Sequence, residues 1–154
     1  MVGPPRAGRA LPLAARGVRA HDGAARAIDP LDGIRRVFAA FAGGDPRALV
    51  EVIAEDAVWR VPGSAPVSRE YRGREQIFEL FRATRRLTDG TYASELRWAL
   101  ADGDRAVAAY RARGRRLGRE LDLDQLLVIT LDGGRWREVL ALPTDPDAFA
   151  AFWS

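Results

Sequence analysis

Apolar residues first recur at helical spacing shortly after residue 30. Asp32 provides an N-cap, and the Gly-Gly pair at 43–44 provides an end, for a helix between them. The apolar positions of this predicted helix, three and four residues apart, are Ile34, Val37, Phe38 and Phe41. The Asp-Pro pair at 45–46 then predicts the start of a second, short helix, and residues 57–61 are typical of a strand.

Proline and glycine within 62–66 indicate a loop. A third helix is predicted after it, with Ile77, Phe78 and Phe81 on one face. Beyond the Asp-Gly pair at 89–90 the apolar period becomes two, as in strands. Four strands joined by tight turns are expected here, over 92–100, 105–113, 120–131 and 135–142.

This order of elements predicts an α+β domain over residues 31–154. Successive hairpins make an antiparallel sheet, and the three N-terminal helices must cover one of its faces. A strongly curved sheet that is closed by helices forms a cone with an internal pocket. The Asp-Pro pair at 145–146 begins a short C-terminal helix, whose aromatic residues we expect at the open end of the cone.

Residues 1–30 show no sustained helical or strand period and are rich in Ala, Arg, Gly and Pro. They resemble a transit peptide in being rich in Arg and poor in acids, but Arg16 and Arg19 interrupt any apolar core of a secretory signal. We interpret this segment as a disordered tail or as the product of a start codon placed too early.

The residue types that are missing narrow the chemistry. The chain has 154 residues, 47% of them hydrophobic, and no Cys, which excludes disulfides and thiolate metal ligands. The one histidine, His21, lies in the N-terminal segment, so neither a Ser-His triad nor a histidine metal site is expected. All 24 basic residues are Arg, and the chain also has no Asn. Acid–base chemistry must then use Asp, Glu, Tyr, Arg or water, and no metal or other cofactor is expected.

The charge pattern argues against a nucleic-acid partner. The net charge is +3, but most Arg residues alternate with acids instead of gathering on one face. The densest group of Arg residues, within 111–119, surrounds a predicted hairpin turn and is typical of a solvated tip. No window approaches the length of apolar sequence that spans a membrane, so we expect a cytoplasmic protein without a membrane partner.

Four stretches resemble the NTF2-like superfamily, and within it the SnoaL-like and ketosteroid-isomerase-related proteins. They are FAAFAGGDPRALVEVIAEDAVWRVPG at 38–63, YRGREQIFELF at 71–81, TYASELRWALADGDRAV at 91–107 and LLVITLDGGRWRE at 126–138. The resemblance implies an NTF2-like cone that binds a small hydrophobic ligand and forms a homodimer through its sheet. It also implies activities of the isomerase, polyketide cyclase, epoxide hydrolase or dehydratase kind.

The catalytic groups of the steroid isomerases have no polar counterpart in this chain. The resemblance places the Asp general base of those enzymes at Val61 and their Tyr oxyanion donor at Val37. Their protonated acid, which donates a hydrogen bond to the substrate, falls at Leu127. Enolisation by the mechanism of those enzymes is therefore not expected.

Strand alternation indicates which residues face the cone. Gln125 and Leu127 share the apolar face of the long strand, and a buried amide there would bind a ligand oxygen or a neighbouring strand. Trp59 shares a face with Val61 and is a second candidate for the pocket wall, with core packing as the alternative.

Three further aromatic residues are candidates for ligand binding. Trp98 and Tyr110 lie on apolar strand faces, and the Tyr110 hydroxyl could donate a hydrogen bond to a ligand. Tyr71 precedes the turn at Gly73, close to the expected mouth of the pocket, although loop packing is the more common role for such a residue. For Trp98 and Tyr110 the alternative is core packing, which is the more common role for such residues.

Two carboxylates are candidates for a general base. Glu138 shares a strand face with Trp136 and Leu140, where desolvation would raise its pKa. The alternative is an exposed ion pair with Arg. Asp124 alternates away from the leucine face, and only a β-bulge would turn it inward.

The sequence supports two functions. The first is a SnoaL-like, cofactor-free isomerase, cyclase, dehydratase or hydrolase that acts on a small hydrophobic oxygenated molecule, either polyketide-like or steroid-like. The second is a non-catalytic ligand-binding or dimerisation module with the same fold. A carboxylate beside an amide or hydroxyl in the cone would favour the enzyme.

Overall fold

The structure is a computed structural model that describes residues 27–154, and most of the predicted N-terminal tail lies outside this range. Three helices precede the long strands, and a fourth ends the described chain. Their bounds are α1 Pro30–Phe41, α2 Arg47–Val52, α3 Arg74–Leu87 and α4 Pro146–Trp153. Among the residues described, no helix combines the length and apolar character needed to cross a membrane.

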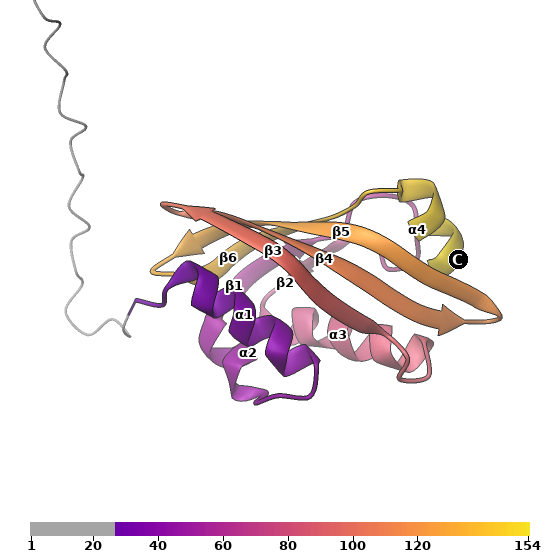
Figure 1. The fold of residues 1–154 in the computed structure, drawn as a ribbon, viewed down its shortest axis with the longest axis horizontal. Coiled ribbons are helices and arrows are strands. Elements are labelled where there is room, and N and C mark those ends of the chain that lie inside the picture. Colours follow the sequence, from indigo (N-terminus) through magenta and orange to yellow (C-terminus); the bar gives the residue numbers. More distant parts are fainter. Residues whose placement is uncertain (1–26) are drawn as a thin grey trace, which may run out of the picture.

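Six strands form one curved sheet in the order β2-β1-β6-β5-β4-β3 (Figure 1). Their bounds are β1 Ile53–Arg60, β2 Glu70–Arg72, β3 Ala93–Asp102, β4 Arg105–Arg116, β5 Arg119–Asp132 and β6 Arg135–Pro143. The expectation of a purely antiparallel sheet is wrong for one pair, because β1 runs parallel to β6. The short strand β2, which falls where only a loop and a turn were predicted, extends the sheet beyond β1.

The first helix begins earlier than the sequence pattern predicts. The Asp29 carboxylate accepts a hydrogen bond from the backbone N–H of Asp32 at 2.9 Å, so Asp29 is the N-cap and Pro30 is the first helical residue. Just before it, the backbone N–H of Ile28 donates to the carbonyl of Gly133. Gly134 has a φ of +80°, and a Cβ there would lie 1.8 Å from the carbonyl oxygen of Ile28, so only glycine fits.

Two β-bulges reverse the alternation of side chains along β3 and β6. In β3 the register shifts between Leu96 and Trp98, so that Trp98 and Leu100 turn outward and are 50% and 66% exposed. In β6 the register shifts between Trp136 and Glu138, so that Trp136 is fully buried and Glu138 turns outward. Simple alternation predicts that Leu96 and Trp98 share one face and that Trp136 and Glu138 share another. Both expectations are wrong.

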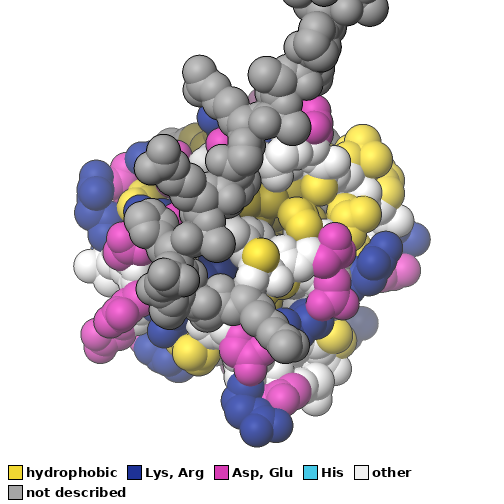
Figure 2. All heavy atoms as spheres, turned by 90° about the vertical axis from the view of Figure 1, so that its left-hand side faces the viewer, with side chains coloured by type: hydrophobic (Ala, Val, Ile, Leu, Met, Phe, Trp, Pro, Cys, Tyr) yellow, Lys and Arg dark blue, Asp and Glu magenta, His cyan; other side chains and the backbone are white. Residues whose placement is uncertain are grey.

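The hydrophobic core lies between the sheet and the helices α1, α2 and α3, which lie on one side of the sheet in Figure 1. Helix α4 closes the core near the start of β3, where the rings of Trp153 and Tyr92 are 6.1 Å apart. Figure 2 shows acidic and basic side chains interspersed over one end of the molecule, with apolar side chains between them.

Candidate functional site

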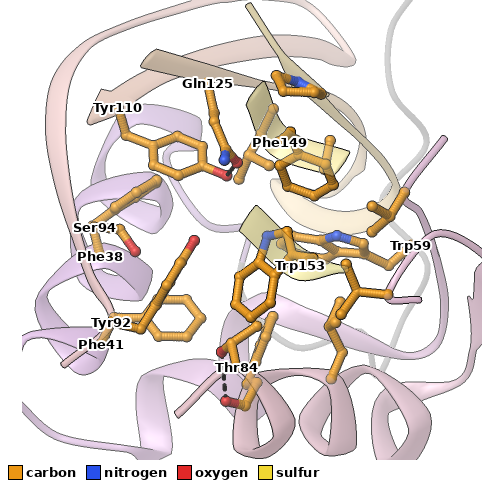
Figure 3. A pocket seen from close by; sticks show the side chains of 17 residues that line it. Phe38, Phe41, Trp59, Thr84, Tyr92, Ser94, Tyr110, Gln125, Phe149 and Trp153 are labelled. Atoms are coloured by element: carbon orange, nitrogen blue, oxygen red, sulfur yellow. Dashed lines mark hydrogen bonds between the residues drawn. The ribbon is translucent and has the colours of Figure 1, made fainter. Parts of the chain in front are cut away.

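A cavity of about 70 Å³ lies in the core, between the concave face of the sheet and the helices (Figure 3). Its wall is mostly aromatic and aliphatic and is drawn from all the major elements. Helices α1 and α3 contribute Phe38, Phe41, Leu80, Phe81 and Thr84, and helix α4 contributes Phe149 and Trp153. A space of this size admits a few water molecules or part of a small organic ligand.

The polar centre of the cavity is a pair of residues that face each other across β4 and β5. Tyr110 and Gln125 are direct partners in the antiparallel register, and the two residues are 6% and 4% exposed. The Tyr110 hydroxyl donates a hydrogen bond to Gln125 Oε1 over 2.7 Å. Gln125 Nε2 has no hydrogen-bond partner among the described residues, which leaves a buried donor at the cavity.

Two more hydroxyl groups extend this polar centre toward α3. Tyr92 and Ser94 lie at the start of β3, and Figure 3 shows the Tyr92 hydroxyl directed toward Tyr110. Burial raises the pKa of Tyr92 to about 12, and the hydroxyls of Ser94 and Tyr110 offset part of this effect. Burial also raises the pKa of Tyr110 well above its usual value. Both phenols are therefore protonated near neutral pH and act as hydrogen-bond donors, not as bases.

Aromatic contacts hold the wall of the cavity in place. Trp59 from β1 packs edge-on against Phe81 of α3, with ring centroids 5.2 Å apart, and Phe81 packs in the same way against Phe41. On the opposite side, the rings of Trp153 and Phe152 lie 4.8 Å apart within α4. Trp153 Nε1 is a second buried donor without a partner among residues 27–154.

A larger outer cavity of about 360 Å³ adjoins this inner cavity. The two share a boundary formed by Phe41, Phe81, Thr84, Tyr92 and Ser94. Further out, the lining includes apolar residues of α1, α2 and α3 together with two arginines of α3. The inner and outer cavities therefore lie side by side between the helices and the start of β3, with these five residues between them.

Five of the predicted ligand-binding residues line the inner cavity together: Trp59, Val61, Tyr110, Gln125 and Leu127. Tyr71 is buried but lies behind the wall, where its hydroxyl donates to the carbonyl oxygen of Val67 at 2.7 Å. Val67 itself lines the cavity, so Tyr71 supports the wall without forming it.

The other three predicted residues lie on the outer face of the sheet. Trp98 is turned outward by the bulge in β3. The Glu138 side chain is 52% exposed and lies 3.8 Å from the guanidinium group of Arg60. Asp124 pairs with Arg111 at 3.1 Å, with its side chain 59% exposed. Of the two interpretations of Glu138, the structure shows the exposed ion pair with Arg, because the bulge in β6 places its carboxylate in solvent beside Arg60.

Several cavity residues were not predicted as ligand-binding residues. Tyr92 and Ser94 share a face with Leu96 ahead of the bulge, so alternation over the first five residues of this segment could have found them. Thr84 and Trp153 come from helices and reach the cavity through tertiary packing, for which a strand pattern carries no signal.

The chemistry open to the inner cavity follows from its neutral lining. Among the described lining residues there is no Asp, Glu, Arg or His, so the polar groups are amide, indole and hydroxyl groups. Such groups donate hydrogen bonds to a carbonyl or hydroxyl oxygen and stabilise negative charge that develops on it. Within residues 27–154, no cluster of three or more metal-ligating side chains is present.

A curved sheet with helices on one face and a hydrophobic cavity between them is the architecture of the NTF2-like proteins. A model of the SnoaL-like domain matches residues 34–139. The chain therefore belongs to the SnoaL-like family of the NTF2-like superfamily.

Proteins that are similar to this chain include the following three, one by sequence and two by structure. An uncharacterized protein from Mycobacterium tuberculosis is 34% identical over 125 residues, which cover 80% of this chain and 95% of the relative. Bal32a, from a soil-derived mobile gene cassette, is 31% identical with a TM-score of 0.77, over 81% of this chain and 96% of that structure. IdmH from Streptomyces antibioticus, a proposed polyketide cyclase, is 25% identical with a TM-score of 0.63, over 76% and 93%.

Proposed function

We propose that this protein binds a small, neutral, largely apolar molecule in the inner cavity and hydrogen-bonds one oxygen of it. The observation that carries the proposal is the unpartnered Gln125 Nε2 group, buried at the cavity beside the phenol of Tyr110. An unsatisfied buried donor is costly, and a ligand carbonyl or hydroxyl would satisfy it. The absence of charge from the described lining favours a neutral ligand over an ion.

The reaction that suits this site is a cofactor-free isomerisation or cyclisation of an oxygenated hydrophobic substrate. Gln125 Nε2 would polarise the substrate carbonyl and stabilise the enolate-like oxygen that develops during reaction. The phenols would remain donors, because burial raises the pKa values of Tyr92 and Tyr110. Proton removal would fall to water or to the substrate itself, since none of the described lining residues is a carboxylate. Membership of the SnoaL-like family and the likeness to IdmH support this reaction class.

A matched pair of ligands tests the binding part of the proposal. Indanone carries a carbonyl that indane lacks, while the two share a carbon skeleton. Calorimetric titration should show indanone binding about 2- to 10-fold tighter than indane, the range that one net hydrogen bond provides. Gln125→Leu should abolish the difference, and the control Gln76→Leu should preserve it, because Gln76 lies on the surface of α3 away from the cavity. Equal affinities in the wild type would contradict the proposed hydrogen bond.

Deuterium exchange at the carbon next to the indanone carbonyl tests the catalytic part. A pocket that polarises the carbonyl should accelerate this exchange in D2O, and Gln125→Leu should reduce the acceleration by about tenfold or more. Mass spectrometry of recovered indanone measures the rate. Binding without any acceleration would rule out this form of activation.

The second candidate function is a non-catalytic ligand-binding module. The neutral lining favours it, because no described cavity residue is a carboxylate that could act as a general base. In that case indanone would bind more tightly to the wild type than to Gln125→Leu. Its rate of deuterium exchange in the presence of the protein would equal the rate in buffer.

A homodimer through the outer face of the sheet remains a prediction. This face carries exposed Trp98 and Leu100, which a second copy of the chain could cover. Sedimentation at several protein concentrations would show whether the chain self-associates.

A further inference from the structure

The outer cavity differs from the inner one in charge. Its described lining contains Arg82 and Arg85 and no acidic residue, whereas the inner lining contains neither sign. The two arginines are three residues apart on α3, and this spacing places them on one face of the helix with the cavity residues Phe78 and Phe81. A ligand that extends from the inner cavity to the surface would therefore pass from a neutral environment to a cationic one.

Within residues 27–154, the two arginines of the outer cavity differ in their ion pairs. Arg82 lies 3.0 Å from the Glu79 carboxylate, and Arg86, outside the cavity, lies 3.6 Å from the same residue. Arg85 has no ion-pair partner within residues 27–154. It lines the outer cavity next to apolar residues. Its location in the last turn of α3 also lets it interact favourably with the helix dipole, a structural role that Arg86 shares.

The outer cavity also has an apolar surface, which suits a hydrocarbon part of a ligand. Leu49, Val50 and Pro46 of the α2 segment face Phe78 of α3 across this space. Val50 is 48% exposed, so its side chain is accessible to a ligand in this space. A hydrocarbon portion in this space would cover these groups and lead toward Arg85.

We propose that the ligand is an apolar molecule with an oxygen at its inner end and an anionic group, a carboxylate or a phosphate, at its outer end, and that Arg85 binds this anion. The inference rests on the proposed function of the inner cavity, because the inner oxygen anchors the molecule. It narrows the ligand class from any small oxygenated hydrophobe to an anionic amphiphile.

Benzoylvaleric acid and its methyl ester are suitable probes. Both carry an aryl ketone for the inner cavity, and only the acid is anionic at the other end. Calorimetry at low salt should show the acid binding about 3- to 5-fold tighter than the ester, as expected for a partly exposed ion pair. High salt should reduce this preference. Benzoylalkyl phosphate in place of the acid would reveal which anion is preferred.

Arg85→Gln should remove the preference for the acid and leave the affinity for the ester unchanged. Arg86→Gln is the matched control, since it removes the same charge from the same helix turn but lies outside the cavity. The proposal is overturned if wild type binds acid and ester equally, or if both variants lose the preference alike. If neither probe binds while the protein is folded by circular dichroism, the proposed function of the inner cavity fails as well.

Discussion

Two neighbouring pairs of residues on β4 and β5 differ in almost every physical respect. Tyr110 and Gln125 face the cavity, are buried and share one neutral hydrogen bond. The next pair in the register is Arg111 and Asp124, which face outward and form an ion pair in solvent. The same two strands thus carry a neutral, desolvated site on one face and a charged, hydrated surface on the other.

This contrast shows why the carboxylates of the chain are poor candidates for catalysis. A carboxylate in the inner cavity would need a partner or a proton, because burial of a lone charge is very unfavourable. On the outer face, Arg111 hydrogen-bonds Asp122 and lowers the pKa of that carboxyl group. Asp122 is thus held ionised beside Arg111, while the inner cavity has uncharged hydrogen-bond donors.

The largest expected difference in the free energy of unfolding is between substitutions of two tryptophans on opposite sides of the sheet. Trp136 is fully buried, whereas Trp98 is half exposed. Trp136→Ala should lower the free energy of unfolding by about 3–5 kcal/mol, and Trp98→Ala by about 0.5 kcal/mol. Urea titrations of both variants measure the difference, and equal losses would contradict the placement of Trp98 outside the core.

A smaller loss is expected from the buried pair. Tyr110→Phe leaves Gln125 Oε1 buried without its donor, and should lower the free energy of unfolding by about 1–3 kcal/mol. Adding Gln125→Leu to Tyr110→Phe should recover part of this loss, because the double variant removes both polar partners. A double variant that is less stable than Tyr110→Phe by the full cost of Gln125→Leu alone would show that the two residues act independently.

The buried phenols should also make stability fall in alkaline solution. The pKa of Tyr92 is raised from 10.0 to about 12 in the folded chain, so the unfolded chain loses its proton first. Stability is therefore fully present below pH 10 and declines as the pH rises from about 10 to about 12. The chain has no Lys or Cys, so tyrosines are the side chains that titrate in this range.

Tyr92→Phe isolates the contribution of Tyr92 to this decline. The variant should lose about 1–2 kcal/mol less stability than wild type over the same pH range. Denaturant titrations at intervals of pH measure this, with Tyr110→Phe as a second variant. Parallel curves for wild type and Tyr92→Phe would mean that Tyr92 ionises equally in the folded and unfolded chains.

The smallest effect should come from the outer ion pairs. Arg111→Gln removes the partner of Asp122 and Asp124 at hydrated positions, and should lower Tm by about 1–3 °C. The difference from wild type should shrink in high salt. It should also shrink as the pH falls through the lowered pKa of Asp122, since a protonated carboxyl loses the ion pair. A loss as large as that of Tyr110→Phe would contradict the contrast between the two faces.

Local patterns predicted most of the secondary structure, because helix spacing, strand alternation and Gly or Pro turns are local features. Gln125 stood out in the same way, as one amide in an apolar row. The parallel pairing of β1 with β6 joins segments that are distant in sequence, so no local pattern encodes it. Strand β2 has three residues, too few to show a period.

The outward placement of Trp98 and Glu138 has one physical origin. A bulge adds one residue to a strand, and from that point onward every side chain changes face. Bulges at Leu96–Trp98 and near Trp136–Glu138 therefore moved a predicted wall residue and a predicted base to the outer surface. The sequence gives no clear marker at either bulge, and neither contains glycine or proline.

The most direct test of the central claim is the side-chain NMR spectrum of protein labelled with nitrogen-15 glutamine. The chain has no Asn, and Gln76 and Gln125 are its two glutamines, so each side-chain NH2 signal can be assigned with one variant. Saturation with indanone should shift the Gln125 signal, which gains an acceptor at Nε2, and leave the exposed Gln76 signal in place. Binding of indanone with an unchanged Gln125 signal would contradict the claim that this amide recognises the ligand oxygen.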